Sequence, residues 1–397
     1  MRRLTVFLLC FALLFSMPVR AQVICEEEID LTELPAVPVT AQGETIDISA
    51  KSAILIDADS GKVIYEMNCD EKSPPASITK IMSLILVMEA IENGQFTYDT
   101  VLSCSETAAS LGGSQIWLEP GEQMSVHDLL KAVAVVSAND ATVLLAEAVA
   151  GSEESFVNMM NEKAGRLGMT NTHFSNSTGL DAEGHYSSAY DVALMSAELL
   201  KHKKITEYTT IWMDSLRGGE SELVSTNKLV RFYEGCTGLK TGTTADAGYC
   251  LSASATRDGL SLVAVVMGAD TSANRFSGAQ KLLNYGFAHF CRVEVSPEIG
   301  ENVTVRVKKG TVRNIKVKTG EKFYAIIKKN EKDKITTVPV LPEEIAAPVK
   351  KGDKVGEVIV LLDDQEIGRV DITACDDAHK INLWRSFVIL LKYLFTL

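Results

Sequence analysis

The sequence contains three groups of polar residues whose types and spacing could support nucleophilic catalysis. They are Ser77-x-x-Lys80, Ser137-x-Asn139 and Lys240-Thr241-Gly242. A serine hydroxyl beside an amine that burial keeps neutral is a possible nucleophile with its general base. Ser77 and Lys80 are three residues apart, so in a helix both point from the same face. The first group therefore predicts a nucleophile and a base, and the other two could hold a substrate.

A purely structural interpretation of the first group stays open at this level. Ser77 could cap the helix, and Lys80 could extend its amine outward to water. The short patterns also recur by chance, because Ser-x-x-Lys occurs again at 225–228 and Ser-x-Asn again at 225–227 and 272–274. Lys-Thr-Gly occurs twice, at 240–242 and again at 318–320. The sequence around each copy must therefore decide between the copies.

Each of the three groups stands at the edge of an element that could position it. The run 74–94 enters with two prolines, continues with apolar residues and ends at Asn93-Gly94, which predicts a helix buried on nearly all sides. Residues 137–140 interrupt two helical stretches with cap and turn residues. Lys240 enters a strand ahead of a hairpin at 249–267. Three polar elements in these settings could line one cleft.

The remaining pattern predicts two domains. Strand-prone runs at 53–58 and 62–66 form a hairpin signal, and helical patterns occupy 156–167, 190–200 and 273–290. Strands at both ends with helices between them predict one mixed domain at 46–291, whose sheet unites the two halves of the chain. Short alternating runs predict a small all-β domain at 292–375. That second domain shows no catalytic constellation.

The two ends of the chain carry targeting patterns. Residues 1–21 have two arginines, an apolar run and a final Val-Arg-Ala, which predicts a signal peptide and export. Residues 22–45 show little periodicity and predict an exposed leader. Residues 376–397 end in an apolar stretch with one polar stripe, which predicts an amphipathic helix lying in a membrane surface. Packing of that helix on the protein's own core is the alternative.

Composition argues against several classes of function. The chain has 397 residues with 46% hydrophobic content, enough for a core in each domain. A net charge of -13 without a basic stripe argues against a nucleic-acid partner. Six histidines without a His-x-x-x-His pair and eight scattered cysteines without Cys-x-x-Cys predict no zinc site. Because export would leave seven cysteines, at least one stays free or pairs between chains, and we expect most to be buried.

In their order along the chain, the motifs resemble those of the penicillin-binding, active-site-serine family, and within it the low-molecular-mass D-alanyl-D-alanine carboxypeptidases. Besides the three groups, the likeness includes Gly113-Ser114, Trp117-Leu118-Glu119-Pro120-Gly121, Asn176-Ser177-Thr178-Gly179-Leu180 and His185-Tyr186-Ser187. It implies a penicillin-binding/β-lactamase-like transpeptidase fold of the α/β (α+β) class. That fold is an antiparallel sheet with a helical subdomain, here followed by a small all-β domain and an amphipathic C-terminal helix.

The resemblance also implies a mechanism and a place of action. A serine-type carboxypeptidase would remove the terminal D-alanine from peptidoglycan stem pentapeptides and be acylated by β-lactam antibiotics, without a cofactor. It would act, as a peripheral protein, at the extracytoplasmic face of the bacterial cell membrane. Ser77 would attack, Lys80 would accept its proton, Ser137 would relay a proton to the leaving amine, and Asn139 would hold Lys80 or the substrate amide. The terminal carboxylate would bind at Lys240, Thr241, Gly242 and Thr243, and the N–H groups of Ser77 and Thr243 would form the oxyanion hole.

Two positions depart from the family pattern, and two other functions compete. Thr226-Asn227 stands where some relatives place an arginine beside the asparagine, and Thr237 where relatives often carry aspartate, so we expect the carboxylate to depend more on Lys240. A serine β-lactamase would use the same groups but also a deacylating base, and Glu-x-x-Leu-Asn is absent. A catalytically idle penicillin-sensing or wall-binding module is the third interpretation, because sequence cannot show that the groups are aligned.

Overall fold

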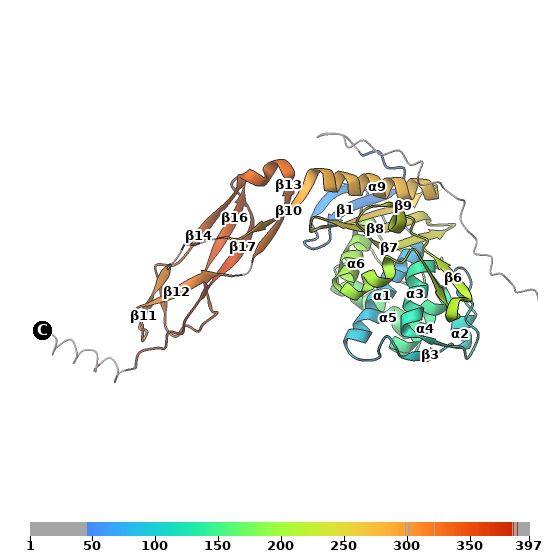
Figure 1. The fold of residues 1–397 in the computed structure, drawn as a ribbon, viewed down its shortest axis with the longest axis horizontal. Coiled ribbons are helices and arrows are strands. Elements are labelled where there is room, and N and C mark those ends of the chain that lie inside the picture. Colours follow the sequence, from blue (N-terminus) through green and yellow to red (C-terminus); the bar gives the residue numbers. More distant parts are fainter. Residues whose placement is uncertain are drawn as a thin grey trace, which may run out of the picture.

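The computed structural model describes residues 46–297, 299–300, 302–320, 322–382, 384 and 387. Figure 1 shows two bodies along the longest axis, a larger one of helices and sheet and a slender one of strands with one short 3-10 helix, η5 (Lys329–Lys334). The predicted signal peptide (1–21), the leader (22–45) and most of the predicted amphipathic helix (376–397) lie outside the described residues. Among the helices that are described, none is both long and apolar enough to cross a membrane.

A five-stranded antiparallel sheet forms the centre of the larger body. Its order is β2 (Val63–Met67), β1 (Ser52–Asp57), β9 (Leu260–Ala269), β8 (Gly248–Arg257) and β7 (Cys236–Thr244). The N-terminal hairpin joins the three later strands through β1 and β9, with Ala53 opposite Val266. The prediction that one sheet unites the two halves of the chain is confirmed. The strand β7, which carries Lys-Thr-Gly, is an edge strand.

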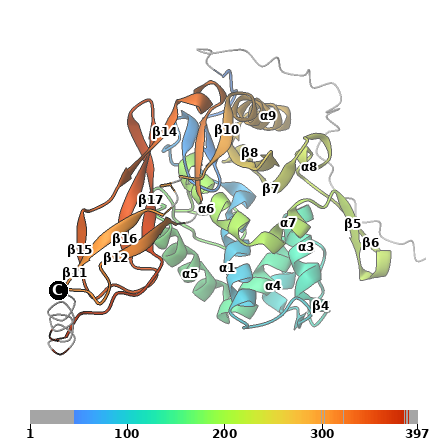
Figure 2. The ribbon, with the colours of Figure 1, turned by 60° about the vertical axis from the view of Figure 1, so that its left-hand side comes forward.

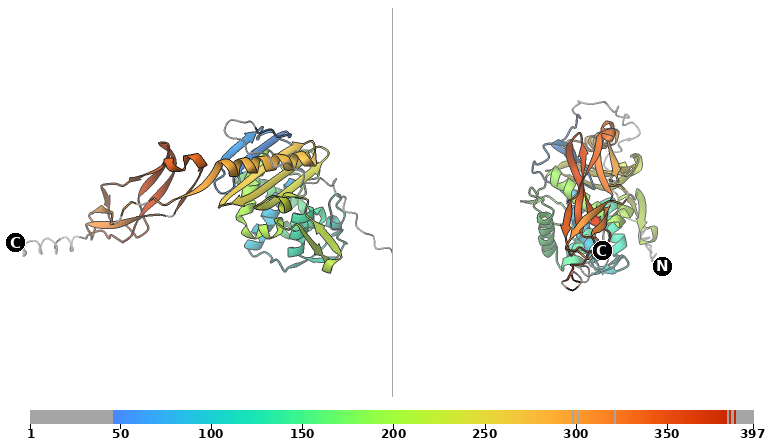
Figure 3. Two further views of the ribbon diagram at one scale, coloured as in Figure 1. Left: turned by 45° about the horizontal axis from the view of Figure 1, so that its top comes forward. Right: turned by 90° about the vertical axis from the view of Figure 1, so that its left-hand side faces the viewer.

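Helices cover both faces of this sheet. On one face lies α9 (Ser272–His289), which crosses the strands in Figure 3 and buries Phe276, Leu282 and Leu283 against them. On the other face the helical subdomain packs, as Figure 2 shows. It contains α1 (Lys80–Glu92), α3 (Val126–Val136), α4 (Asn139–Ala150), α5 (Glu153–Arg166) and α6 (Ala189–Lys201), with the short α2 (Glu106–Ala109) and α7 (Thr206–Thr209). The short α8 (Leu229–Phe232) belongs to the α9 side, where Leu229 joins the core beneath α9.

The buried helix predicted at 74–94 is present, with one difference at its start. A 3-10 turn, η2 (Ala76–Thr79), precedes α1, which begins only at Lys80. Apolar and polar residues on every face of α1 are buried, from Lys80 to Met88. The tighter turn places Ser77 ahead of the α-helix, in a segment whose backbone the surrounding elements fix. Two short hairpins flank the helices: β3 (Val101–Ser103) with β4 (Gln123–Ser125), and β5 (Met213–Leu216) with β6 (Ser221–Val224).

The slender body is made of strands around a core of valine and isoleucine. Its six-stranded sheet has the order β14 (Ile335–Val340), β16 (Lys354–Leu362), β17 (Gln365–Ala374), β12 (Asn314–Thr319), β11 (Thr304–Lys308), β15 (Glu344–Ala346). A separate pair, β10 (Phe290–Val295) with β13 (Phe323–Lys328), leads into it from α9. The boundary expected between residues 291 and 292 falls inside β10. Ile326 of β13 packs into the core beneath α9, which fastens the two bodies together.

The cysteines within the described ranges are all free. Cys104 and Cys250 are buried, and Cys69, Cys236, Cys291 and Cys375 are half-buried. The expectation that at least one thiol stays unpaired within the chain is confirmed. The expectation of burial holds fully only for the first two, because the others lie at the margins of their elements.

Candidate active site

Ser77 and Lys80 face each other at the start of α1. Lys80 Nζ donates a hydrogen bond to Ser77 Oγ at 3.0 Å and another to the backbone carbonyl of Thr178 at 2.7 Å. The Lys80 side chain is completely buried, whereas Ser77 is half-buried. The interpretation of Ser77 as a helix cap and Lys80 as an outward-reaching lysine is therefore wrong. The pair has the geometry that a nucleophile and its base require.

Burial lowers the pKa of Lys80 well below its ordinary value, and the nearby positive charge of Lys240 lowers it further. The carboxylate of Asp140 acts in the opposite direction but more weakly. A lysine amine must be neutral to accept a proton, and desolvation penalises its charged form. The site thus favours the protonation state in which Lys80 can act as a base.

Two glycines let the neighbouring backbone come close to the nucleophile. A Cβ added at Gly242 of β7 would lie 2.9 Å from the Pro75 carbonyl oxygen and 3.0 Å from the Ser77 backbone nitrogen. A Cβ at Gly179 would come within 1.8 Å of the Ala76 carbonyl oxygen. Ala76 itself has a positive φ of 49°. Because side chains are absent at both contacts, β7 and the 176–180 loop hold Ser77 from two sides.

Ser137 and Asn139 lie where α3 ends and α4 begins, as predicted. Ser137 adopts the left-handed conformation (φ 64°, ψ 33°) that ends α3, and its Oγ is buried without a hydrogen-bond partner. Asn139 Nδ2 donates to the Gly112 carbonyl at 2.6 Å, while Asn139 Oδ1 is buried and unpaired. Of the two partners expected for Asn139, Lys80 makes no hydrogen bond with it, and the substrate amide stays a prediction for the unpaired Oδ1.

The Lys-Thr-Gly strand closes the site on the opposite side. Lys240 is buried and its Nζ donates to the Thr241 carbonyl at 2.9 Å. Thr241 Oγ1 donates to Thr226 Oγ1 at 2.7 Å, and the Thr226 backbone nitrogen donates to the Val135 carbonyl near the end of α3. These contacts tie β7 to the segment that carries Ser137. The three groups predicted from the sequence therefore lie around one site.

Arg275 is a site residue that the sequence did not reveal. It is buried in α9, and its Nη1 donates to Thr243 Oγ1 at 2.7 Å and to the Gly242 carbonyl at 3.2 Å. The expectation that the carboxylate depends more on Lys240 stays a prediction, and Arg275 adds a second cation beside Thr243. No local motif surrounds this arginine, and only the packing of α9 on β8 and β9 brings it to the site.

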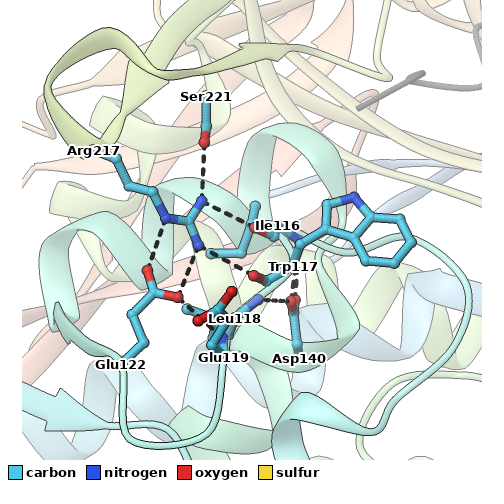
Figure 4. A network of polar contacts seen from close by, with 8 residues as sticks. All are labelled: Ile116, Trp117, Leu118, Glu119, Glu122, Asp140, Arg217 and Ser221. Carbon is cyan, nitrogen blue, oxygen red and sulfur yellow. Dashed lines mark hydrogen bonds and ion pairs between the residues drawn. The ribbon is translucent and has the colours of Figure 1, made fainter. Parts of the chain in front are cut away.

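A loop held by hydrogen bonds on both sides lies beside Asp140 (Figure 4). The start of the same loop contacts Asn139, whose backbone N–H donates to the Ser114 carbonyl at 2.7 Å. The buried carboxylate of Asp140 accepts the backbone N–H groups of Ile116 and Leu118 at 3.0 to 3.2 Å. From the other side, Arg217 donates to the Ile116 carbonyl at 3.0 Å and forms a two-bond ion pair with Glu122. Trp117 between them has a positive φ of 59° and an exposed side chain. The network fixes the strained loop from both faces.

Metal-assisted chemistry has no candidate ligands at this site. Across the part of the chain that the structure describes, no three His, Cys, Asp or Glu side chains gather closely enough to hold a metal ion. The groups that the site does offer are a hydroxyl, a neutral amine, unpaired polar atoms and two cations.

Comparison with known proteins agrees with this geometry. A family model described as D-alanyl-D-alanine carboxypeptidase matches residues 38–271, and one described as penicillin-binding protein 5, C-terminal domain, matches residues 298–380. D-alanyl-D-alanine carboxypeptidase DacF of Bacillus subtilis is 44% identical over 338 residues, which cover 83% of this chain and 86% of the relative. DacC of Escherichia coli is 37% identical over 332 residues, covering 82% of this chain and 83% of that relative.

Solved structures extend the comparison to the fold. Penicillin-binding protein 5 from Haemophilus influenzae superposes with a TM-score of 0.76 at 30% identity, covering 85% of this chain and all of that one. Penicillin-binding protein D2 from Listeria monocytogenes, solved in its ampicillin-bound form, gives a TM-score of 0.57 at 33% identity over 62% of this chain and all of that one. The predicted transpeptidase fold is confirmed, and the carboxypeptidase interpretation is supported over the lactamase and the idle module. The chain belongs to the family of serine-type D-alanyl-D-alanine carboxypeptidases among the penicillin-binding proteins.

Proposed function

We propose that this protein removes the terminal D-alanine of a peptidoglycan stem peptide through an acyl-enzyme on Ser77. The observation that carries the proposal is the 3.0 Å contact between Ser77 Oγ and a fully buried Lys80 amine. Ser77 Oγ attacks the carbonyl between the two D-alanines while its proton passes to Lys80. The C–N bond then breaks, the departing amine takes up a proton by way of Ser137, and water later hydrolyses the ester.

Unpaired polar atoms support a peptide substrate at this site. Ser137 Oγ, Asn139 Oδ1 and Asn227 Nδ2 are buried without partners. Such an atom typically costs about 1 to 3 kcal/mol when it stays unsatisfied, so a site that keeps several is suited to a ligand that supplies partners. The amide groups of a stem peptide offer both donors and acceptors for these atoms.

The end of the substrate is proposed to bind between β7 and α9. Lys240 and Arg275 bring two positive charges to the neighbourhood of Thr241 and Thr243, which suits a terminal carboxylate. The oxyanion hole would be formed by the backbone N–H groups of Ser77 and Thr243. The close approach of Gly242 to the Ser77 nitrogen supports this arrangement.

The decisive experiment measures D-alanine release from diacetyl-Lys-D-Ala-D-Ala by the soluble protein, with and without Ser77→Ala. Ser83→Ala is the matched control, since Ser83 is a buried serine of the same helix that bonds only the Ser177 carbonyl at 2.6 Å. We expect release by the wild type and the control, and loss in Ser77→Ala. No release by the folded wild type, or an unchanged Ser77→Ala variant, would contradict the proposal. Rapid nitrocefin turnover without a lasting covalent adduct would favour a β-lactamase instead.

We further propose that the protein is exported and held peripherally at the outer face of the cell membrane. The apolar run at 1–21 and the amphipathic pattern at 376–397 support this placement. Deleting residues 380–397 should move the protein to the soluble fraction with its carboxypeptidase activity intact. If the truncated protein still sediments with membranes, the attachment lies elsewhere in the chain.

A further inference from the structure

His185 lies behind the catalytic pair and makes two well-defined hydrogen bonds. Its Nδ1 accepts the backbone N–H of Ser175 at 2.9 Å, and its Nε2 lies 2.8 Å from Thr79 Oγ1. A backbone N–H can only donate, so Nδ1 must be unprotonated and a neutral ring carries its proton on Nε2. In that tautomer Nε2–H donates to the Thr79 hydroxyl. The surroundings thus define both the ring orientation and the proton position of His185.

Thr79 connects this histidine to the catalytic turn. It is the last residue of η2, fully buried between Ser77 and Lys80 in the chain. Its hydroxyl makes no capping bond to α1, although Thr79 occupies the position that precedes the helix. The hydroxyl also lies against Gly179, next to the Thr178 carbonyl that accepts a hydrogen bond from Lys80 Nζ. A shift of Thr79 would therefore disturb both the nucleophile and the base.

We propose that His185 is a positioning residue, whose neutral Nε2–H form holds Thr79 and thereby keeps Ser77 Oγ in register with Lys80 Nζ. The inference rests on the proposed acyl-enzyme function and adds a role for a residue outside the three motif groups. Displacements of about 1 Å at a reacting group can reduce rates about 100-fold. Loss of a single hydrogen bond at the turn could therefore lower the acylation rate measurably.

The environment of His185 keeps the required form populated. Burial lowers its pKa to about 4, the charge of His173 lowers it as well, and Asp181 acts in the opposite direction. The other side of the ring faces Phe174, which adds no charge. Protonation of Nδ1 would remove the acceptor for the Ser175 N–H. The positioning bond is therefore intact near neutral pH and fails only in acid.

The test compares four variants by the rate of acylation with benzylpenicillin and by kcat and KM for the tripeptide. His185→Leu removes both bonds, Thr79→Val removes the hydroxyl with little change of shape, and His185→Gln keeps a donor. We expect the first two to lower the acylation rate about 10- to 100-fold with KM nearly unchanged, and the double variant to be no slower than the slower single. Glutamine should restore most of the rate.

His173→Gln is the matched control. His173 belongs to the same loop, but its Nδ1 contacts the Gly184 carbonyl and its ring lies against Tyr186, so its side chain makes no hydrogen bond to η2. Its acylation rate should stay at the wild-type level. Wild-type acylation rates in folded His185→Leu and Thr79→Val, or a lower melting temperature alone, would overturn the positioning role. That outcome differs from failure of the proposed function, in which the wild type itself would release no D-alanine.

Discussion

The two bodies of this molecule treat charge in opposite ways. In the helical and sheet body, the buried charged residues include Lys80, Lys240, Asp140 and Arg275. In the slender β body, the buried side chains of the described residues are all apolar, and its charged groups form ion pairs at the surface. Burying a charge costs free energy unless partners compensate. In this molecule, charged groups are buried only in the body that contains the candidate active site, within the residues that the structure describes.

The same contrast appears inside the larger body, between two buried lysines. Lys80 has no carboxylate bonded to it, and its pKa falls well below the ordinary value. Burial alone would lower the pKa of Lys163 too, but hydrogen bonds to Glu198 and Glu89 raise it above the ordinary value. Lys163 Nζ lies 2.8 Å and 2.6 Å from those two carboxylates. Lys80 is thus suited to accept a proton, whereas Lys163 is suited to stay a charged partner of two carboxylates.

Replacing each lysine by methionine should give the largest and most divergent effects. Lys80→Met should reduce the acylation rate about 10²- to 10⁴-fold, because the general base is lost. It should also raise the free energy of unfolding, since the unfolded chain no longer gains by protonating an amine that the fold keeps neutral. Penicillin acylation and chemical denaturation measure the two changes.

Lys163→Met is the control, and we expect the opposite pattern. The Lys163→Met variant should keep the wild-type acylation rate. Its free energy of unfolding should fall by on the order of 2 kcal/mol, because two carboxylates are left without their cation. A Lys80→Met variant that is less stable than the wild type would show that the amine is charged in the folded protein. The distinction between the two lysines would then fail.

The second-largest effect concerns stability as a function of pH. We expect His185 to make the free energy of unfolding of the larger body depend on pH. A histidine whose pKa is about 4 when folded and about 6.5 when unfolded takes up a proton on unfolding between these values. Above pH 6.5 the histidine is neutral in both states and does not affect the free energy of unfolding. As the pH falls from 6.5 toward 4, protonation of the unfolded state lowers the free energy of unfolding, by about 3 kcal/mol in total. Burial raises the pKa values of Asp57 and Asp191, and these groups work in the opposite direction.

The difference between wild type and His185→Gln isolates this contribution. Denaturation curves measured from pH 7 to pH 4 should show the wild type losing more stability than the glutamine variant, because glutamine does not titrate. The control His173→Gln should follow the wild type. Parallel curves for wild type and His185→Gln would mean that His185 titrates normally in the fold.

Local patterns predicted that Ser77 and Lys80 pair at the start of a buried helix, but they could not predict what surrounds the pair. Two prolines, an unbroken apolar run and Asn93-Gly94 are enough to indicate a buried helix with Ser77 and Lys80 at its start. Arg275 was missed because its partner Thr243 lies 32 residues away on another element, and helical periodicity says nothing about which side chain reaches a neighbouring strand. For the same reason the sequence did not give the Asn139 contact with Gly112.

A smaller effect should follow from loosening the loop beside Asn139. Arg217→Ala removes the bonds to the Ile116 carbonyl and to Glu122, while Asp140 still holds the opposite side of the loop. We expect a loss of about 10-fold in kcat/KM for the tripeptide, equivalent to about 1.4 kcal/mol of transition-state stabilisation. Lys204→Ala, whose ion pair with Glu207 is exposed and 3.9 Å long, is the control. Equal rates in both variants would show that the loop needs no clamp from Arg217.

The smallest effect should come from removing an ion pair of the β body. This prediction tests whether surface ion pairs contribute little to the stability of that body. Arg369 bonds Glu366 at 2.7 and 2.9 Å and also pairs with Glu357 across the strands. Because water and salt screen charges at the surface, Arg369→Ala should leave the melting temperature and the acylation rate unchanged within error. Ile372→Val, a completely buried change in the neighbouring core, should cost about 1 kcal/mol. If the arginine variant proves the less stable of the two, surface pairs hold this body together, and burial of apolar side chains is not its main source of stability.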